Sequence, residues 1–132
     1  MVPTVYSLHS KHKVFKLRQR LTCLNYGVYV ATCVTCGEQY VGQTANKFST
    51  RWNAHRSAWK KYDISDNTDQ AALLRHAALH FDINDKPQIF DCYSVYFVEQ
   101  PNHDTLDICE DKWLHRTRAS INIQDIMLPK IK

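Results

Sequence analysis

Two tyrosines and an arginine are spaced in this sequence so that they could cleave a phosphodiester bond. Tyr29 closes a Gly-Val-Tyr triplet, Tyr40 opens a Tyr-Val-Gly triplet, and Arg51 follows shortly after. Hydrolysis requires a deprotonated water, positive charge beside the phosphorane and stabilisation of the leaving oxygen. A phenol with a pKa of about 10 is a poor base unless cations lower that pKa. Arg51 could do so while its planar guanidinium holds the phosphate, and a divalent ion on one carboxylate would supply the remaining charge.

A second group of residues has the composition of a zinc site. Cys33 and Cys36 are two residues apart and are followed by Gly37, which permits the tight turn of a zinc knuckle. Zinc takes four ligands, so two more must come from elsewhere in the chain. His76 and His80 lie one helical turn apart and can converge on one ion. The sequence therefore predicts a Cys₂His₂ site that joins the turn of a hairpin to a helix.

Other cysteines and histidines compete for this metal. Cys23, His9 and His12 lie upstream and could also reach an ion, and a reduced cysteine pair with surface histidines is the simpler alternative. Cys92 and Cys109 lie in apolar surroundings and are predicted core residues. A redox function is disfavoured because a thioredoxin-type Cys-x-x-Cys opens a helix, whereas this pair lies in a turn.

Composition and charge favour a single domain that binds a polyanion. The chain has 132 residues, of which 44% are hydrophobic, and this length suffices for one domain with a core. No apolar run approaches the length of roughly 20 residues that a membrane-spanning helix needs. Residues 1–61 contain ten Lys/Arg and one acid, whereas residues 62–132 contain seven Lys/Arg and twelve acids. The five cysteines, an odd number, fit a reducing compartment better than a disulfide framework. The basic half predicts contact with nucleic acid unless the two halves interleave in space.

The hydrophobic pattern predicts an α+β fold with a small three-stranded antiparallel sheet flanked by helices. Residues 1–20 form a basic lead-in, either a short helix or an arm, and residues 119–132 a strand-like or irregular tail. A run of β-branched and aromatic residues at 89–100 predicts a central or well-covered strand. The remaining expected elements are a hairpin over 25–44 and helices over 45–61, 69–80 and 105–117.

The first predicted helix has an apolar face and a basic face. Phe48, Trp52, His55 and Trp59 recur every three or four residues, and we expect the two tryptophans to pack in the core rather than stack on bases. Four basic side chains of the same region are the candidates for DNA contact: Lys47, Arg51, Arg56 and Lys60.

The ordered set of motifs resembles the GIY-YIG nuclease family. The two triplets, Arg51, His55 and the segment CEDKWLHRTRASIN match that family's pattern over residues 26–123. Cysteines between the two triplets make the chain most similar to the endonuclease domain of Penelope-like retroelements. Valine replaces isoleucine in both triplets, which keeps a β-branched strand residue. Ser120-Ile121 replaces the frequent Gly-Leu before Asn122, so Asn122 is the assignment that departs most from the pattern.

The resemblance implies a role for each matching residue. Tyr40 would be the general base and Tyr29 would orient water or phosphate, although the residues themselves do not decide between the two tyrosines. Arg51 and His55 would contact phosphate. Glu110 would bind Mg²⁺ or Mn²⁺, in competition with Asp107 and Asp111 on the same helix. Asn122 would order the site. The same resemblance implies structural Zn²⁺ on the Cys₂His₂ set.

The implied function is a divalent-metal-dependent DNA endonuclease that nicks target DNA for target-primed reverse transcription. A reverse transcriptase would then be linked to this domain in a longer protein. The protein would be intracellular and nuclear, and it would not bind a membrane. Residues 1–23 would be a lead-in and residues 24–132 the endonuclease domain. The alternatives are an inactive zinc-stabilised DNA-binding module, a stand-alone GIY-YIG repair or homing nuclease, and, with least support, a metal-handling protein.

Overall fold

The computed structural model describes residues 4–6, 14–17, 19, 21–62, 71–81 and 87–122. Its centre is a three-stranded antiparallel sheet in the order β4-β3-β5. The strands are β3 (Gly27–Cys33), β4 (Gln39–Thr44) and β5 (Tyr93–Glu99). A separate two-stranded sheet pairs β1 (Thr4–Tyr6) with β2 (Val14–Lys16). The predicted α+β class and three-stranded sheet are therefore confirmed.

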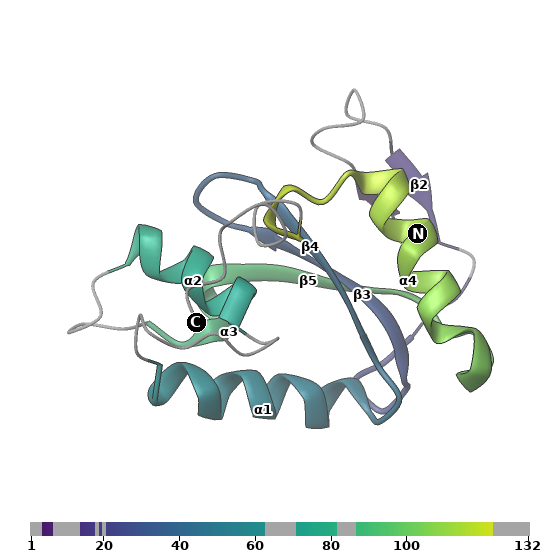
Figure 1. Cartoon of the computed structure of the whole chain (residues 1–132), viewed down its shortest axis with the longest axis horizontal. Helices are drawn as coiled ribbons and strands as arrows, with labels where there is room; N and C mark the ends of the chain where they lie inside the picture. Colours follow the sequence, from purple (N-terminus) through teal and green to yellow (C-terminus); the bar gives the residue numbers. More distant parts are fainter. Residues whose placement is uncertain are drawn as a thin grey trace, which may run out of the picture.

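Helices cover both faces of this sheet (Figure 1). They are α1 (Phe48–Lys60), α2 (Ala71–His80), the short α3 (Ile89–Cys92) and α4 (Leu106–Thr117), with the 3₁₀ turn η2 (His103–Thr105) leading into α4. Helix α4 lies on one face, and α1 lies with α2 and α3 on the other. No helix within the described ranges is long and apolar enough to cross a membrane.

The sheet has two apolar faces because successive strand side chains alternate between them. Tyr29, Ala31 and Tyr40 pack toward α1 and α2, whereas Val30 and Val41 pack with residues of α4. Every residue of β3 is buried, as expected of a central strand with helices on both sides. Phe48, Trp52, His55 and Trp59 are the buried residues of α1, which confirms that the tryptophans belong to the core.

The register of the β3–β4 hairpin decides which site residues share a face. Tyr29 pairs with Gly42, and Ala31 pairs with Tyr40. Cross-strand partners point to the same face of a sheet, so both tyrosines face α1. The turn between the strands closes at Gly37, whose φ of 80° lies in the left-handed region that glycine adopts without strain.

Three expectations about the elements differ from the structure. The strand expected over 89–100 starts only at Tyr93, because Ile89–Cys92 form α3, and it is an edge strand rather than a central one. A short apolar run does not distinguish helix from strand by its period. In the lead-in, the described residues 4–6 and 14–16 form the β1–β2 pair and not a short helix, which leaves the alternative of an arm. The tail is helical over residues 120–122, and residues 123–132 lie outside the described part.

Candidate active site and metal centre

Tyr29 is the most enclosed of the predicted catalytic side chains. Its exposed fraction is 0%, and its ring lies among Phe48, Trp52 and Tyr40, with ring centroids 5.6–6.4 Å away. The Tyr29 hydroxyl is hydrogen-bonded to Nε2 of His55 at 3.1 Å. Tyr29 is therefore held in one orientation by packing and by a polar partner.

Gly42 makes room for Tyr29. A Cβ atom at position 42 would overlap Cζ and Oη of the Tyr29 ring. The ring thus crosses strand β4 directly over its cross-strand partner, and only a residue without a side chain fits beneath it. The glycine of the Tyr-Val-Gly triplet is explained by this contact rather than by backbone conformation, because its φ is not positive.

Burial keeps the Tyr29–His55 pair neutral. It raises the pKa of Tyr29 to about 12, although the charge and hydrogen bond of Arg51 act in the opposite direction. Burial, with a further contribution from the Arg51 charge, lowers the pKa of His55 to about 4. At neutral pH the phenol therefore keeps its proton and the imidazole is uncharged.

His55 lies in the core beside Tyr29. Its exposed fraction is 0%, and its Nε2 atom faces Tyr29 instead of solvent. Its Nδ1 atom is buried without a hydrogen-bond partner among the described residues. His55 therefore contacts Tyr29 and the Trp52 ring, whose centroid lies 4.9 Å from that of the imidazole.

Arg51 is a half-buried cation in the first turn of α1. Its charge acts to lower the pKa of Tyr29 and that of Glu110. The Nε atom of Arg51 is buried and has no hydrogen-bond partner in the described part of the chain. A buried guanidinium N–H that lacks an acceptor is well suited to receive an oxygen of a bound anion.

Glu110 approaches from the opposite face of the sheet, on α4. Its side chain is half-buried, and burial raises the pKa of its carboxyl group although a hydrogen bond from Gln43 opposes this shift. Gln43 also donates from Nε2 to Oδ1 of Asp107 at 2.6 Å. Asp111 points outward, with a side chain 69% exposed, as expected if Glu110 faces the sheet.

Asn122 binds the backbone at the open edge of β4. Its Oδ1 accepts a hydrogen bond from the Val41 N–H at 2.8 Å, and its Nδ2 donates to the Val41 carbonyl at 3.0 Å. Val41 stands between Tyr40 and Gly42, so this pair of bonds fixes the strand at the point where the tyrosine must be placed. Asn122 therefore contacts the backbone of the strand that carries Tyr40.

The edge of β4 is where the predicted catalytic residues come together. Tyr29, Tyr40 and Arg51 reach it from the α1 face, and Glu110 reaches it from the α4 face. Electrostatic coupling links the two groups, since the Glu110 charge raises the pKa of Tyr29 and the Arg51 charge lowers that of Glu110. The three other basic candidates, Lys47, Arg56 and Lys60, are exposed on or beside α1.

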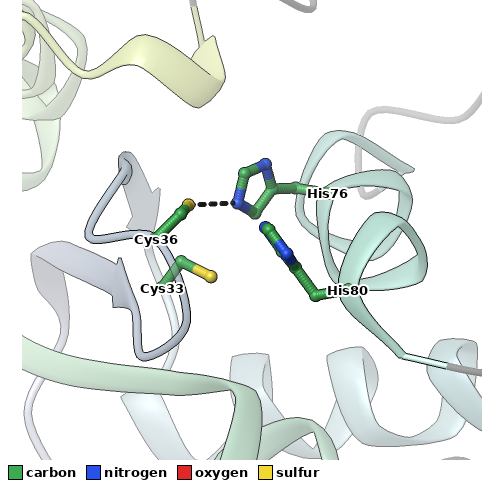
Figure 2. A group of neighbouring side chains, drawn as sticks. All are labelled: Cys33, Cys36, His76 and His80. Atoms are coloured by element: carbon green, nitrogen blue, oxygen red, sulfur yellow. Dashed lines mark hydrogen bonds between the residues drawn. The ribbon is translucent and has the colours of Figure 1, made fainter.

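Four predicted zinc ligands lie together at the other end of the hairpin. Figure 2 shows Cys33 and Cys36 on the hairpin and His76 and His80 on α2, all pointing into one space. Their candidate ligand atoms lie within 4.8 Å of one another. Two zinc-bound sulfurs are about 3.8 Å apart at tetrahedral geometry and Zn–S bonds of about 2.3 Å, so small movements would complete a site.

The polar atoms of this cluster match what zinc requires. Cys36 Sγ and His76 Nε2 are 3.2 Å apart, and Nε2 of His80 is buried with no hydrogen-bond partner among the described residues. Nδ1 of His76 lies 3.5 Å from Oε2 of Glu38. Burial raises the pKa of Cys36 to about 11, although a backbone hydrogen bond at Glu38 acts to lower this pKa. The thiolate form of Cys36 would therefore need a cation beside it.

The rival ligands are separate from this cluster or lie outside the described residues. Cys23 is exposed and is not among the clustered ligands, and His9 and His12 fall in undescribed segments. Cys92 and Cys109 are buried, as predicted.

Comparison with known proteins agrees with this geometry. Residues 25–122 match the family described as the GIY-YIG catalytic domain. The chain belongs to this family. The catalytic domain of homing endonuclease I-TevI superposes on this GIY-YIG domain with a TM-score of 0.54 at 18% sequence identity, covering 74% of this chain and 94% of that one. At this identity the likeness concerns the fold. None of the curated proteins matches the chain.

Three residues of this GIY-YIG domain contribute in ways that the sequence analysis missed. They are Gln43 beside Glu110, Glu38 beside His76, and Gly42 beneath Tyr29. Strand alternation offered a signal for Gln43, because it places residue 43 on the face opposite Tyr40. Glu38 is the single acid of residues 1–61, and it immediately follows the turn from Cys33 to Gly37.

Proposed function

We propose that this chain is a divalent-metal-dependent DNA endonuclease. The observation that carries the proposal is that Arg51 and Glu110 both act on Tyr29 and on each other across the sheet, with the Tyr40 ring 6.4 Å from that of Tyr29. A half-buried carboxylate next to a guanidinium with a free N–H can receive a metal ion and a phosphate side by side. The family membership supports the same reaction class.

Each group has a role in hydrolysis. Tyr40, as the phenolate, accepts a proton from water, the water oxygen bonds to phosphorus, and the bond from phosphorus to the 3′ oxygen breaks as that oxygen takes up a proton from a surrounding water molecule. Arg51 offsets the charge that develops on the phosphoryl oxygens. A Mg²⁺ or Mn²⁺ ion held by Glu110 supplies further positive charge, and Asn122 keeps β4 in place.

The burial of the two tyrosines supports Tyr40 as the base. Burial raises the pKa of Tyr29 to about 12, so this phenol keeps its proton and suits orientation of water or phosphate. Tyr40 retains some exposure, 9%, and is therefore closer to solvent. In this proposal His55 fixes the Tyr29 hydroxyl through their hydrogen bond, and its contact with phosphate stays a prediction.

DNA binds along the exposed side of α1 in this proposal. Lys47, Arg56 and Lys60 are exposed there, and Arg51 continues the basic set into the site. The Arg56 guanidinium lies over the ring of Phe90, with Cζ 5.2 Å from the ring centroid, which restricts its orientation. Phosphate contacts of this kind place the duplex without reading its sequence.

We further propose that Cys33, Cys36, His76 and His80 bind one structural Zn²⁺. The convergence of their ligand atoms supports this assignment. Glu38 would then hold the outer nitrogen of His76, as carboxylates do for many zinc-bound histidines. Such a site would fix the hairpin turn against α2 and so stabilise the strands that carry both tyrosines.

The biological setting we propose is a retroelement of the Penelope-like type. Cys33 and Cys36, which lie between the two tyrosine triplets, support it. The enzyme would nick nuclear DNA, and the released 3′ hydroxyl would prime a reverse transcriptase linked to this domain. A stand-alone repair or homing nuclease would use the same site.

Plasmid nicking tests the activity. The wild-type protein with Mg²⁺ or Mn²⁺ should convert supercoiled plasmid to open circles, and EDTA should prevent this. Tyr40→Phe and Glu110→Ala should lose at least about 100-fold in rate. Asp111→Asn is the matched control, because this exposed carboxylate adjoins Glu110 and should be dispensable. A wild-type protein that binds plasmid without cutting it would favour the inactive DNA-binding module.

A further inference from the structure

We infer that α1 lies in the major groove of B-form DNA, where the exposed amide of Asn53 reads a base edge. The inference rests on the proposed function, because it names the way in which the same enzyme holds its substrate. It goes beyond phosphate contact, since it assigns a groove and a residue that determines sequence preference.

The outward face of α1 carries polar side chains at helical spacing. Thr50, Asn53 and Ser57 are exposed and follow one another at intervals of three and four residues, so they share one face of the helix. The buried residues of α1 occupy the face toward the sheet. In Figure 1, α1 runs along the lower edge of the molecule. The three side chains therefore form a polar strip that points away from the core.

Cations border this polar strip on both sides. Lys47 and Arg51 are one helical turn apart, as are Arg56 and Lys60. The two pairs lie on different flanks, because Arg51 and Arg56 are separated by about 140° around the helix axis, with the buried face between them. Arg56 is held on its flank by Phe90 of α3, with Cζ 5.2 Å from the ring centroid. No acidic residue occurs from position 39 to position 62, so the whole surface of α1 attracts a polyanion.

Two flanks of cations match the two phosphate backbones of a groove. The major groove of B-DNA is about 12 Å wide and admits an α-helix, which measures about 10–12 Å across with its side chains. A sugar–phosphate strand borders this groove on either side. A helix that met one strand from outside would need cations on one flank only, and the minor groove, about 6 Å wide, is too narrow for a helix. The two flanks therefore favour the major groove.

The polar strip has the chemistry to read bases, although it does not favour the helix. Threonine, asparagine and serine are poorer helix formers than alanine, lysine or glutamate, yet they take solvent-facing positions where packing makes no demand on residue type. The asparagine amide both donates and accepts hydrogen bonds, which matches N7 and N6 of adenine in the major groove. Asn53 is therefore the residue of the strip best suited to select a base.

The place of the strip on α1 predicts where the sequence is read. Arg51 is the flanking cation that contributes to the proposed active site, so the strand along its flank is the one that is cut. Asn53 follows Arg51 by two residues, about 3 Å along the helix axis. The base that Asn53 reads should thus lie in the same half-turn of DNA as the nick, within about five base pairs.

Selection from a randomised duplex library tests the reading residue. The wild-type protein binds the library at fixed salt without Mg²⁺ or Mn²⁺, and sequencing of the bound fraction gives its preference. Asn53→Ala should lose about 10-fold or more of the preference for adenine at one position, and Asn53→Gln should restore part of it, because glutamine pairs with adenine in the same way. The slope of log affinity against log salt concentration should stay unchanged, since no phosphate contact is lost. Alanine is a strong helix former, so Asn53→Ala keeps α1 intact. Asn102→Ala removes an exposed asparagine outside α1 and is the matched control.

Blocking the groove separates major-groove binding from phosphate contact alone. A duplex whose cytosines carry glucosylated 5-hydroxymethyl groups has a filled major groove but an unchanged phosphate charge. The wild-type protein should bind it at least about 10-fold more weakly than the unmodified duplex of the same sequence. Equal affinities for the two duplexes would overturn the inference, as would an Asn53→Ala variant with the wild-type preference or a wild type with no preference. A wild type that reads the major groove through Asn53 but never nicks plasmid would overturn only the proposed endonuclease activity.

Discussion

Substituting Gly42 by alanine tests the close approach of Tyr29 to β4. In an ordinary strand this change stabilises a protein by about 0.5–1 kcal/mol, because glycine loses more conformational freedom on folding. Here the added methyl group would overlap the Tyr29 ring, which Phe48 and Trp52 hold in place. Overpacking of a core costs about 1–3 kcal/mol, and displacing the Tyr29–His55 hydrogen bond costs about 1 kcal/mol more. We therefore expect Gly42→Ala to destabilise the protein by about 1–3 kcal/mol, a sign opposite to the usual one.

Urea denaturation followed by tryptophan fluorescence measures this loss. With a slope of about 2 kcal/mol per M urea, the midpoint should fall by about 1 M. Zinc must be held constant, since bound metal changes the apparent stability. The decisive comparison uses Tyr29→Leu, in which the ring is absent. Gly42→Ala should be neutral or slightly stabilising in that background, and an equal cost in both backgrounds would refute the steric explanation.

Three other properties follow from the site. Between pH 6.5 and about 4 the unfolded chain protonates His55 while the folded protein does not. The free energy of unfolding should therefore fall with decreasing pH, by up to about 3 kcal/mol more in the wild type than in His55→Gln. Urea titrations at several pH values measure this, and parallel curves for the two proteins would contradict it. Elemental analysis should find about one zinc per chain. Cys33→Ser should lose this zinc and lower the thermal midpoint by several degrees, whereas Cys109→Ser should retain the zinc. Equal zinc contents in the two variants would exclude the Cys₂His₂ assignment. If Arg56 contacts one phosphate, Arg56→Ala should reduce the slope of log affinity for DNA against log salt concentration by about 0.9. Lys112 donates from Nζ to Oε1 of Glu99 at 2.6 Å, and Lys112→Ala should leave that slope unchanged.

The elements of the fold were predictable where local patterns are strong. The apolar spacing from Phe48 to Trp59 predicts α1 and its buried face, and the structure confirms both. The hairpin was predictable from β-branched runs on either side of a glycine turn. The position of β5 was not, because its apolar composition is the same for a central strand and for an edge strand packed under helices. Pairing partners are a long-range property that a run of ten residues does not encode.

The sequence by itself determined which residue types were available and on which elements they would lie. The order of Tyr29, Tyr40, Arg51 and Glu110 implied a nuclease site, and Cys33 with Cys36 implied a metal, because these signals depend only on residue type and short spacing. Only the tertiary structure decided their surroundings, since burial and hydrogen bonding arise from segments far apart in the chain. Packing of α1 on β3 buries His55 against Tyr29 and removes it from solvent. Packing of α4 on β4 brings Asp107 to Gln43, whose Nε2 donates to its Oδ1 at 2.6 Å, a contact between residues whose identities alone gave no reason to connect them.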